Sequence, residues 1–183
     1  MRITGGLYKN RKLNVPDGNA VRPTSDRMRQ SLFNMLNHAK WANDFDLTKA
    51  HVLDLFCGSG ALGLESLSYG AQHATFVDLD ISSIKQNSHF MDGTQFDIIK
   101  QNATKLSLQN DVQFDCVFMD PPYREGLVMR TLQNLVDKNY MADNAIVIIE
   151  CEKELDLQTD LELLDKRAQG QSNLYILRYN AAI

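Results

Sequence analysis

Residues 51–63 read HVLDLFCGSGALG, and the order of residue types in this stretch decides the fold. The run 51–56 is apolar enough for a buried strand, and the leucines after it recur at helical spacing. Gly58 and Gly60 permit positive φ and let a ligand lie against bare backbone. The start of the helix adds unpaired N–H groups and a partial positive charge. The stretch therefore predicts a strand, a ligand-binding turn and a helix.

The same alternation of strand and helix patterns continues along the chain. We expect strands at 52–56, 74–78, 96–100, 114–119 and 145–150, helices at 60–69, 81–90 and 125–138, and a closing pair of strands at 160–164 and 173–179. A further helix begins at Thr24 or Ser25, whose hydroxyls cap it. Four apolar side chains lie on one face of that helix: Met28, Leu32, Met35 and Leu36. This layout predicts an α/β fold, a mostly parallel sheet with helices on both faces.

The glycines also match the dinucleotide fingerprint G-x-G-x-x-G as far as Gly63, so an NAD-dependent enzyme has to be considered. Two features argue against it. Asp54 places an acid inside the strand end, where it would repel a pyrophosphate but attract a ligand's ammonium group. The sequence also shows no obvious second domain for a hydride acceptor.

Polar residues follow the next two predicted strands. Asp78 stands 20 residues after Gly58, the spacing of a carboxylate that binds a ribose hydroxyl, and Asp80 is a nearby competitor for that role. Asn102, followed by Ala103, comes next, and an amide there can read the edge of an adenine. Taken singly, each is more often a strand-end or capping residue. As an ordered set at successive strand ends they favour a nucleoside site.

Asp120-Pro121-Pro122-Tyr123 stands directly after the predicted buried strand 114–119. Two prolines remove two backbone donors and push Asp120 out of the helical region. The carboxylate and the adjacent carbonyls can therefore accept both hydrogens of an exocyclic amine, while the tyrosine ring stacks on the base. The alternative is an ordinary β-turn, which uses the same residue types. The upstream glycines favour the functional interpretation.

With these motifs in place, the chain resembles the S-adenosylmethionine-dependent methyltransferases with a Rossmann-like fold. The resemblance is carried by Asp54-Leu55-Phe56-x-Gly58-Ser59-Gly60, Asp78, Asn102 and Asp120-Pro121-Pro122-Tyr123. More narrowly, it resembles the bacterial 16S rRNA guanine(966)-N2 methyltransferases through Arg2-Ile3-Thr4-Gly5-Gly6, Arg11-Lys12-Leu13, Val15-Pro16-Asp17, Arg22-Pro23-Thr24-Ser25-Asp26-Arg27, Asp54–Glu65 and Asp120–Gly126. The likeness runs from Arg2 to about Tyr179. Cys57 and Tyr123 stand where relatives often have Ala and Phe.

The resemblance implies a class I methyltransferase fold of seven strands, whose last strand is antiparallel and inserted between its neighbours. It implies S-adenosylmethionine as the cofactor, S-adenosylhomocysteine as the product, and no metal. The cofactor would be held by Asp54, Phe56, Gly58, Ser59, Gly60, Asp78, Asn102 and Ala103. The target guanine, flipped out of its stack, would be held by Asp120, the Pro121 carbonyl and Tyr123.

Charge separates an arm, residues 1–22, from a methyltransferase domain, 23–183. Residues 1–30 carry seven Lys or Arg against two acids, a net +5, whereas the rest of the chain has a net charge of −9. We expect the arm to form a short β-hairpin over 3–15 and to meet RNA phosphates. The expected RNA contacts are Arg2, Lys9, Arg11, Lys12, Arg22, Thr24 and Arg27. The alternative is a solvated hairpin whose cations only keep it soluble.

Composition predicts one soluble domain. A chain of 183 residues with 44% hydrophobic content can bury a single core without staples. Its apolar runs are too short to cross a bilayer, and the first residues show no signal-peptide pattern, so we expect a cytoplasmic protein, and a monomer. Cys57, Cys116 and Cys151 are expected to be reduced core thiols.

Two other functions stay open. An N6-adenine methyltransferase of DNA or RNA would use the same Asp-Pro-Pro-Tyr chemistry, although a DNA enzyme would be expected to carry a sizeable target-recognition domain. A non-catalytic, cofactor-binding rRNA chaperone would bind the cofactor without methyl transfer. The sequence leaves open whether free 16S rRNA, a small-subunit assembly intermediate or the full subunit is the substrate.

Overall fold

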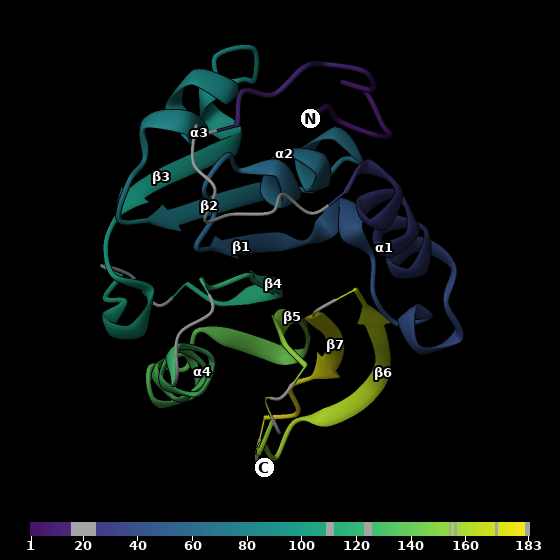
Figure 1. The fold of residues 1–183 in the computed structure, drawn as a ribbon, viewed down its shortest axis with the longest axis vertical. Coiled ribbons are helices and arrows are strands. Elements are labelled where there is room, and N and C mark those ends of the chain that lie inside the picture. The colour runs from purple at the N-terminus through teal and green to yellow at the C-terminus, as the bar shows by residue number, and fades with distance from the viewer. Residues whose placement is uncertain are drawn as a thin grey trace.

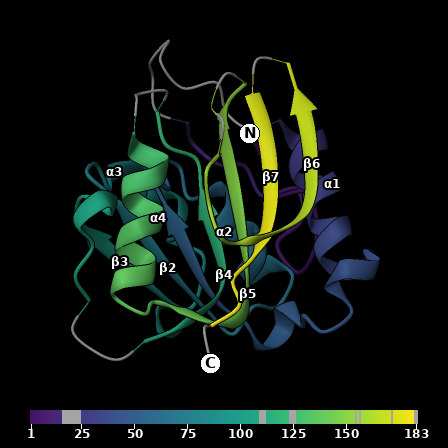
Figure 2. The same ribbon diagram turned by 90° about the horizontal axis from the view of Figure 1, so that it is seen from below.

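The computed structural model describes residues 1–15, 25–108, 112–122, 126–153, 155, 157–170 and 172–181. Its centre is a seven-stranded sheet with the strand order β3-β2-β1-β4-β5-β7-β6 (Figure 1). The strands are β1 (His51–Leu55), β2 (His73–Asp78), β3 (Phe96–Lys100), β4 (Phe114–Met119), β5 (Met141–Glu152), β6 (Glu162–Gln169) and β7 (Ser172–Arg178). β1 to β5 pair in parallel, whereas β7 is antiparallel to both β5 and β6. The predicted insertion of an antiparallel last strand is confirmed (Figure 2).

Helices cover both faces of the sheet, as predicted. The α-helices are α1 (Asp26–His38), α2 (Ala61–Ser68), α3 (Ser82–Asn87) and α4 (Leu127–Asp137), and the 3₁₀ helices are Lys40–Ala42, Leu47–Lys49, Gly93–Gln95 and Ala103–Lys105. Side chains of α1, α2 and α3 pack in one core with alternate strand residues such as Val52 and Phe118. Side chains of α4 pack in a second core with Leu53 and Val117, one position along each strand. Figure 2 shows α4 lying across its face of the sheet.

Three elements differ in length from the prediction. β5 begins at Met141 rather than at 145, because Asn144 takes φ 64° and the ladder shifts register opposite Phe114 and Cys116, which hides the strand's start. β6 runs to Gln169 rather than to 164, since an edge strand tolerates charged side chains. α3 ends at Asn87 rather than at 90, where the chain tightens into a turn.

The N-terminal arm folds back on itself, but its antiparallel pairing is shorter than the expected hairpin over 3–15. Arg2 pairs with Lys12, Ile3 N donates to Arg11 O at 2.9 Å, and Leu13 N donates to Met1 O at 3.0 Å. Its backbone also bonds to α2, because Leu7 N donates to Ser68 O at 2.7 Å. The side chains of Ile3 and Leu13 are buried in the α1–α3 core. The arm therefore packs on the body, over α2 (Figure 1).

Among the described residues, no helix is long and apolar enough to cross a membrane.

Candidate active site

The predicted cofactor-binding and catalytic residues that the structure describes lie at or near the ends of parallel strands. The four strands β1 to β4 are adjacent and parallel, so their carboxyl ends lie at the same end of the sheet (Figure 1). Asp78 closes β2, Asn102 follows β3 and Asp120 follows β4, while the glycine turn 56–60 follows β1. In open α/β sheets this end is where ligands bind. The order of the strands therefore brings the predicted residues together.

The glycine turn has the backbone that its sequence predicts. Phe56, Gly58 and Gly60 take φ values of 56°, 51° and 75°. A Cβ built on Gly58 would meet nothing within 4 Å, so the peptide backbone there faces open space. A Cβ on Gly60 would stand 2.1 Å from Ile84 Cδ1, so this glycine lets α3 approach the turn. Gly58 thus suits a ligand, and Gly60 suits packing.

Asp54 lies beneath this turn, buried at the end of β1. Its Oδ2 accepts a hydrogen bond from Gly63 N of α2 at 2.9 Å. Burial raises the pKa of the Asp54 carboxyl to about 8, and the charges of Asp120 and Asp78 add to the rise against the lowering effect of the Gly63 bond. A cationic ligand group nearby would favour the charged carboxylate and bind more tightly for it.

The structure separates the roles of Asp78 and Asp80. Asp78 Oδ2 accepts from Gly58 N at 2.8 Å, and its Oδ1 accepts from Asp80 N at 3.1 Å. Asp80 is exposed, and its Oδ1 accepts from Ser82 N at 3.0 Å at the start of α3. Asp78 therefore belongs to the glycine turn, and Asp80 belongs to a helix start.

Asn102 is exposed, and its amide oxygen is used locally. Oδ1 accepts from Thr104 N at 3.0 Å and from Thr104 Oγ1 at 2.9 Å, which caps the 3₁₀ helix Ala103–Lys105. This is the capping role that the sequence left as an alternative. Ala103 is buried in the α4-side core, 3% exposed, and holds this loop against the sheet.

Asp120 follows β4 and lines a cavity of about 230 Å³ that is open to solvent. The polar lining of the cavity is Asp120 and Glu150, and its apolar lining is Met28, Leu32, Leu62, Met119, Ile148 and Leu174. Burial raises the pKa of the Asp120 carboxyl to about 7, and the nearby charge of Glu150 adds to the rise. Tyr123, the predicted stacking residue, lies outside the described residues.

A second cavity, of about 300 Å³, lies on the α4 side of the same strand end. Pro121 and Pro122 line it together with Gly126, Val128, Met129, Cys151, Glu152 and Leu155. Pro121 therefore stands beneath this cavity and next to Asp120 of the first.

Two polar residues at the site were missed from the sequence. Glu150 lies near the end of β5, so the strand-end rule that found Asp78 and Asp120 could have found it. Asn87 is buried in α3, and no sequence signal marks it. Its Nδ2 donates to Ser59 O at 2.9 Å and to Asn14 O at 2.8 Å, which ties the glycine turn to the arm.

A buried ion pair fastens the arm to the helices. Arg29 of α1 and Glu65 of α2 are both fully buried, with Nε and Oε2 3.5 Å apart. Arg29 Nη2 donates to Arg2 O at 2.6 Å, and Glu65 Oε1 accepts from Thr4 N at 2.7 Å and Gly5 N at 2.9 Å. Buried charges need such partners. The arm is therefore held in place by the pair.

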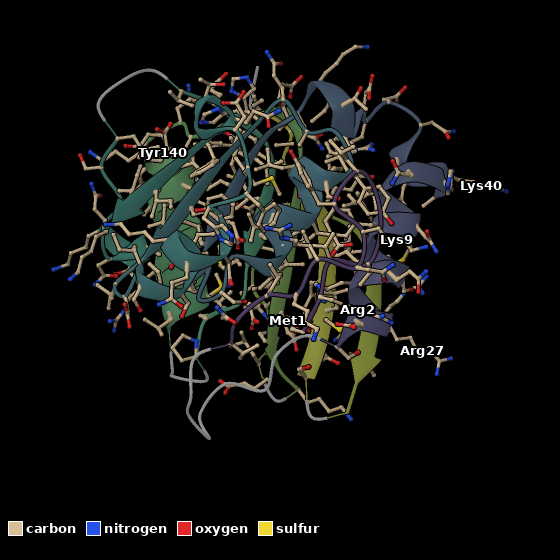
Figure 3. The ribbon with its side chains drawn as sticks, turned by 90° about the horizontal axis from the view of Figure 1, so that it is seen from above. Met1, Arg2, Lys9, Arg27, Lys40 and Tyr140 are labelled. Atoms are coloured by element: carbon tan, nitrogen blue, oxygen red, sulfur yellow. The ribbon has the colours of Figure 1, made fainter. Side chains whose placement is uncertain are left out.

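The basic side chains predicted to meet RNA lie on the surface, and two of them have partners. Arg2 Nε lies 3.3 Å from Asp26 Oδ2, and the Arg11 guanidinium lies 4.4 Å from the centre of the Phe90 ring. Lys9, Lys12 and Arg27 are exposed, and Figure 3 shows Arg2, Lys9 and Arg27 on one side of the molecule. Arg22 and Thr24 lie outside the described residues.

The chain matches, over residues 1–178, a family model described as Conserved hypothetical protein 95. It is 38% identical over 162 residues to the ribosomal RNA small subunit methyltransferase D of Escherichia coli strain K12, covering 87% of this chain and 78% of that protein. The chain belongs to the family of that methyltransferase. The protein of the same name from Haemophilus influenzae is 34% identical over 179 residues, covering 93% of this chain and 89% of the relative.

Solved structures agree with the membership of this methyltransferase family. The structure of the Escherichia coli protein yhhF matches with a TM-score of 0.84 and 34% identity, covering 100% of this chain and 99% of that chain. SMU.776, solved in complex with SAH, matches with a TM-score of 0.62 and 14% identity, covering 89% of this chain and 52% of that one, a likeness of fold alone. The predicted Rossmann-like class I methyltransferase fold is confirmed.

Proposed function

We propose that this methyltransferase moves a methyl group from S-adenosylmethionine to the exocyclic N2 amine of a guanine in 16S ribosomal RNA. One observation carries the proposal. Asp120, followed by two prolines, lines a cavity, and it lies at the same end of the sheet as the glycine turn. The name of the Escherichia coli relative supports a ribosomal RNA substrate of the small subunit.

The residues present fit such a cofactor. The open space at Gly58 leaves backbone for the methionine end, and Asp54 beneath the turn would face its ammonium group. Asp78 at the end of β2 would bind the ribose hydroxyls, and Phe56 and Ser59 belong to the same turn. Asn102 and Ala103 would border the adenine.

When bound, the cofactor supplies an electrophilic methyl group on a sulfonium. Asp120 and the Pro121 carbonyl would accept the two N–H bonds of the guanine amine and direct its lone pair toward that methyl. The amine nitrogen would take up the methyl group while the carbon–sulfur electron pair stays on sulfur. The surplus proton of the alkylated amine would pass to the Asp120 carboxylate that accepts its hydrogen bond, and from there to water. Positioning supplies most of the rate, because the amine becomes acidic as it is alkylated. The target base would leave its stack and be received by Tyr123.

The arm supports an RNA partner. Arg2 and Lys9 of the arm lie on the same side of the molecule as Arg27 of α1 (Figure 3), and Met28 and Leu32 of α1 line the Asp120 cavity. Phosphates bound by Lys9, Arg11 and Lys12 would therefore direct a nucleotide toward the site. A ribosomal RNA substrate, free or in an assembly intermediate, places the reaction in the cytoplasm, and we expect a monomer to carry it out.

The test is methyl transfer from cofactor labelled in its methyl group. We expect label in 16S rRNA from unmodified small-subunit particles or from naked rRNA, and the preferred substrate is the one labelled faster. Asp120→Ala should remove the transfer while cofactor binding stays. Cofactor binding without transfer to either RNA would favour the chaperone alternative, and label on an adenine N6 amine would favour the adenine methyltransferase.

A further inference from the structure

Glu150 is placed to act on the same base as Asp120. β4 and β5 are parallel neighbours in which Met119 pairs with Ile149, so the next residues along the two strands, Asp120 and Glu150, lie side by side. Both carboxyl groups line the cavity of about 230 Å³. The two acids thus face one small space from adjacent strands.

The third strand of this region orients Glu150. Its Oε1 accepts a hydrogen bond from Ser172 Oγ of β7 at 2.8 Å. A carboxylate has two oxygens with about four acceptor positions, so a carboxylate held by neighbouring side chains can still accept a hydrogen bond from a ligand. β7 is the strand inserted beside β5, and it therefore holds the Glu150 side chain in register with the cavity.

Guanine and adenine differ at the position next to the amine. In guanine, the N2 amine is flanked by N1–H, a second donor, whereas the N6 amine of adenine is flanked by N1, an acceptor. Two adjacent carboxylates match a pair of adjacent donors. They disfavour adenine, because the N1 lone pair beside its amine would face a carboxylate in an apolar cavity.

We propose that Glu150 accepts the N1–H of the target guanine while Asp120 holds the N2 amine, so that Glu150 selects guanine over adenine. The proposal rests on the proposed function. It names the residue that decides which exocyclic amine is methylated, and it makes Glu150 a specificity residue of the candidate site.

The charges around the cavity fit this division of roles. Among the described residues, the charge that raises the pKa of Asp120 is that of Glu150 from β5, and the charge of Asp120 in turn helps to raise the pKa of Asp54 from β1. α1, α2 and β7 contribute apolar side chains to the cavity, Met28, Leu32, Leu62 and Leu174. With Glu150→Gln, loss of the negative charge should lower the pKa of Asp120 and shift the acid limb of the rate to lower pH.

The test compares two target bases in single-turnover methylation. Small-subunit rRNA carrying guanine at the methylated position is compared with rRNA carrying 2-aminopurine there, which keeps the N2 amine but has an acceptor at N1. We expect the wild-type protein to prefer guanine. Glu150→Gln should reduce that preference at least about tenfold, the scale of one hydrogen bond to a charged group.

Two variants serve as controls. Asp120→Asn should lower the rate on both bases by the same factor, because both bases carry the amine that Asp120 holds. Glu162→Gln, on the edge strand β6 and away from the cavity, should leave both rates and the pH profile unchanged. Melting temperature and cofactor affinity check that each variant is folded.

An equal loss on both bases in Glu150→Gln, with an unshifted acid limb, would overturn the specificity role and leave Glu150 a structural residue. If Glu150→Gln does not fold, Ser172→Ala keeps the carboxylate but removes its orienting hydroxyl, and it should reduce the preference several-fold. An unchanged preference in Ser172→Ala would then overturn the proposal. Failure of the proposed function itself would appear in the wild-type reactions, as no RNA methylation or as methylated adenine.

Discussion

The carboxylates in the two halves of the candidate site have different hydrogen-bond partners. In the half that follows β1 and β2, both acids accept hydrogen bonds from the backbone. Asp54 accepts from Gly63 N of α2 at 2.9 Å, and Asp78 accepts from Gly58 N of the glycine turn at 2.8 Å. In the half that follows β4 and β5, Asp120 and Glu150 line an apolar cavity, and the neighbouring hydroxyl of Ser172 binds Glu150. The first half is thus organised by its own backbone, while the second presents acceptors that suit the donors of a base.

This difference predicts that a substitution in one half should impair the function of that half and leave the other half intact. Backbone bonds make the first half a preformed cofactor site, so changes there should act on cofactor affinity. Changes to the paired acids of the second half should lower the rate of methyl transfer, because the N–H groups that they accept belong to the substrate base.

The largest effect is expected in the second half. Asp120→Ala removes the acceptor that orients the amine, and it should lower the turnover rate at least about a hundredfold. Cofactor affinity should change little, since Asp54 and Asp78 keep their bonds. Single-turnover kinetics measure the rate, with Asp137→Ala at the exposed end of α4 as the matched control. A near-normal single-turnover rate would remove Asp120 from the mechanism.

In the first half, Asp78→Ala should weaken cofactor binding by about 2 kcal/mol, the scale of a hydrogen bond to a charged group. The change also removes the acceptor of Gly58 N, so the turn loses one of its ties to β2 and keeps the bond from Cys57 N to Val77 O. Asp80→Ala is the matched control, because Asp80 serves the start of α3. Calorimetry measures both affinities. A loss in Asp80→Ala without one in Asp78→Ala would assign the ribose to the other carboxylate.

The two halves should also differ in their response to pH. The pKa of Asp120 is raised to about 7, so the protonated form dominates below that pH and can accept fewer hydrogen bonds. The single-turnover rate should therefore fall about tenfold per pH unit below 7 and level off above it. A rate that stays constant from pH 5 to 8 would show that the ionised Asp120 is not required.

The smallest effect is expected outside both halves, in the arm. Replacing Arg11 and Lys12 with Ala should flatten the salt slope of RNA binding by up to about two units and leave cofactor affinity unchanged. Arg11 also packs on Phe90, so a modest loss of melting temperature is expected from that residue and not from the exposed Lys12. Lys138→Ala, at the end of α4, is the control. An unaltered slope with a lower melting temperature would make the arm a cover for the core.

The sequence predicted the backbone of the first half better than the rest. Gly58, Gly60 and Asp78 act locally along the chain, through a turn and a strand end, and patterns of spacing detect such residues. Asn102 was predicted from its position after a strand as well, yet its amide oxygen caps a 3₁₀ helix. That outcome shows that a residue type in the right place can serve either role.

The second half and the arm were harder to predict because they depend on long-range packing. Glu150 lies beside Asp120 only through the pairing of β4 with β5, and the hydroxyl that holds it comes from β7. The arm showed strand-like residues and does pair with itself, but its backbone also bonds to α2 and to Glu65, which no local pattern indicates. Asn87 joins the arm to the glycine turn from a helix without any motif.

The identity of the methylated nucleoside tests the central claim most directly. Unmodified small-subunit rRNA is incubated with the protein and cofactor, digested to nucleosides, and analysed by mass spectrometry. The paired acceptors at the ends of β4 and β5 predict N2-methylguanosine in the product, formed by the wild-type protein and not by Asp120→Ala. Methylation on an adenine amine, or cofactor binding with no methylated nucleoside at all, would contradict it.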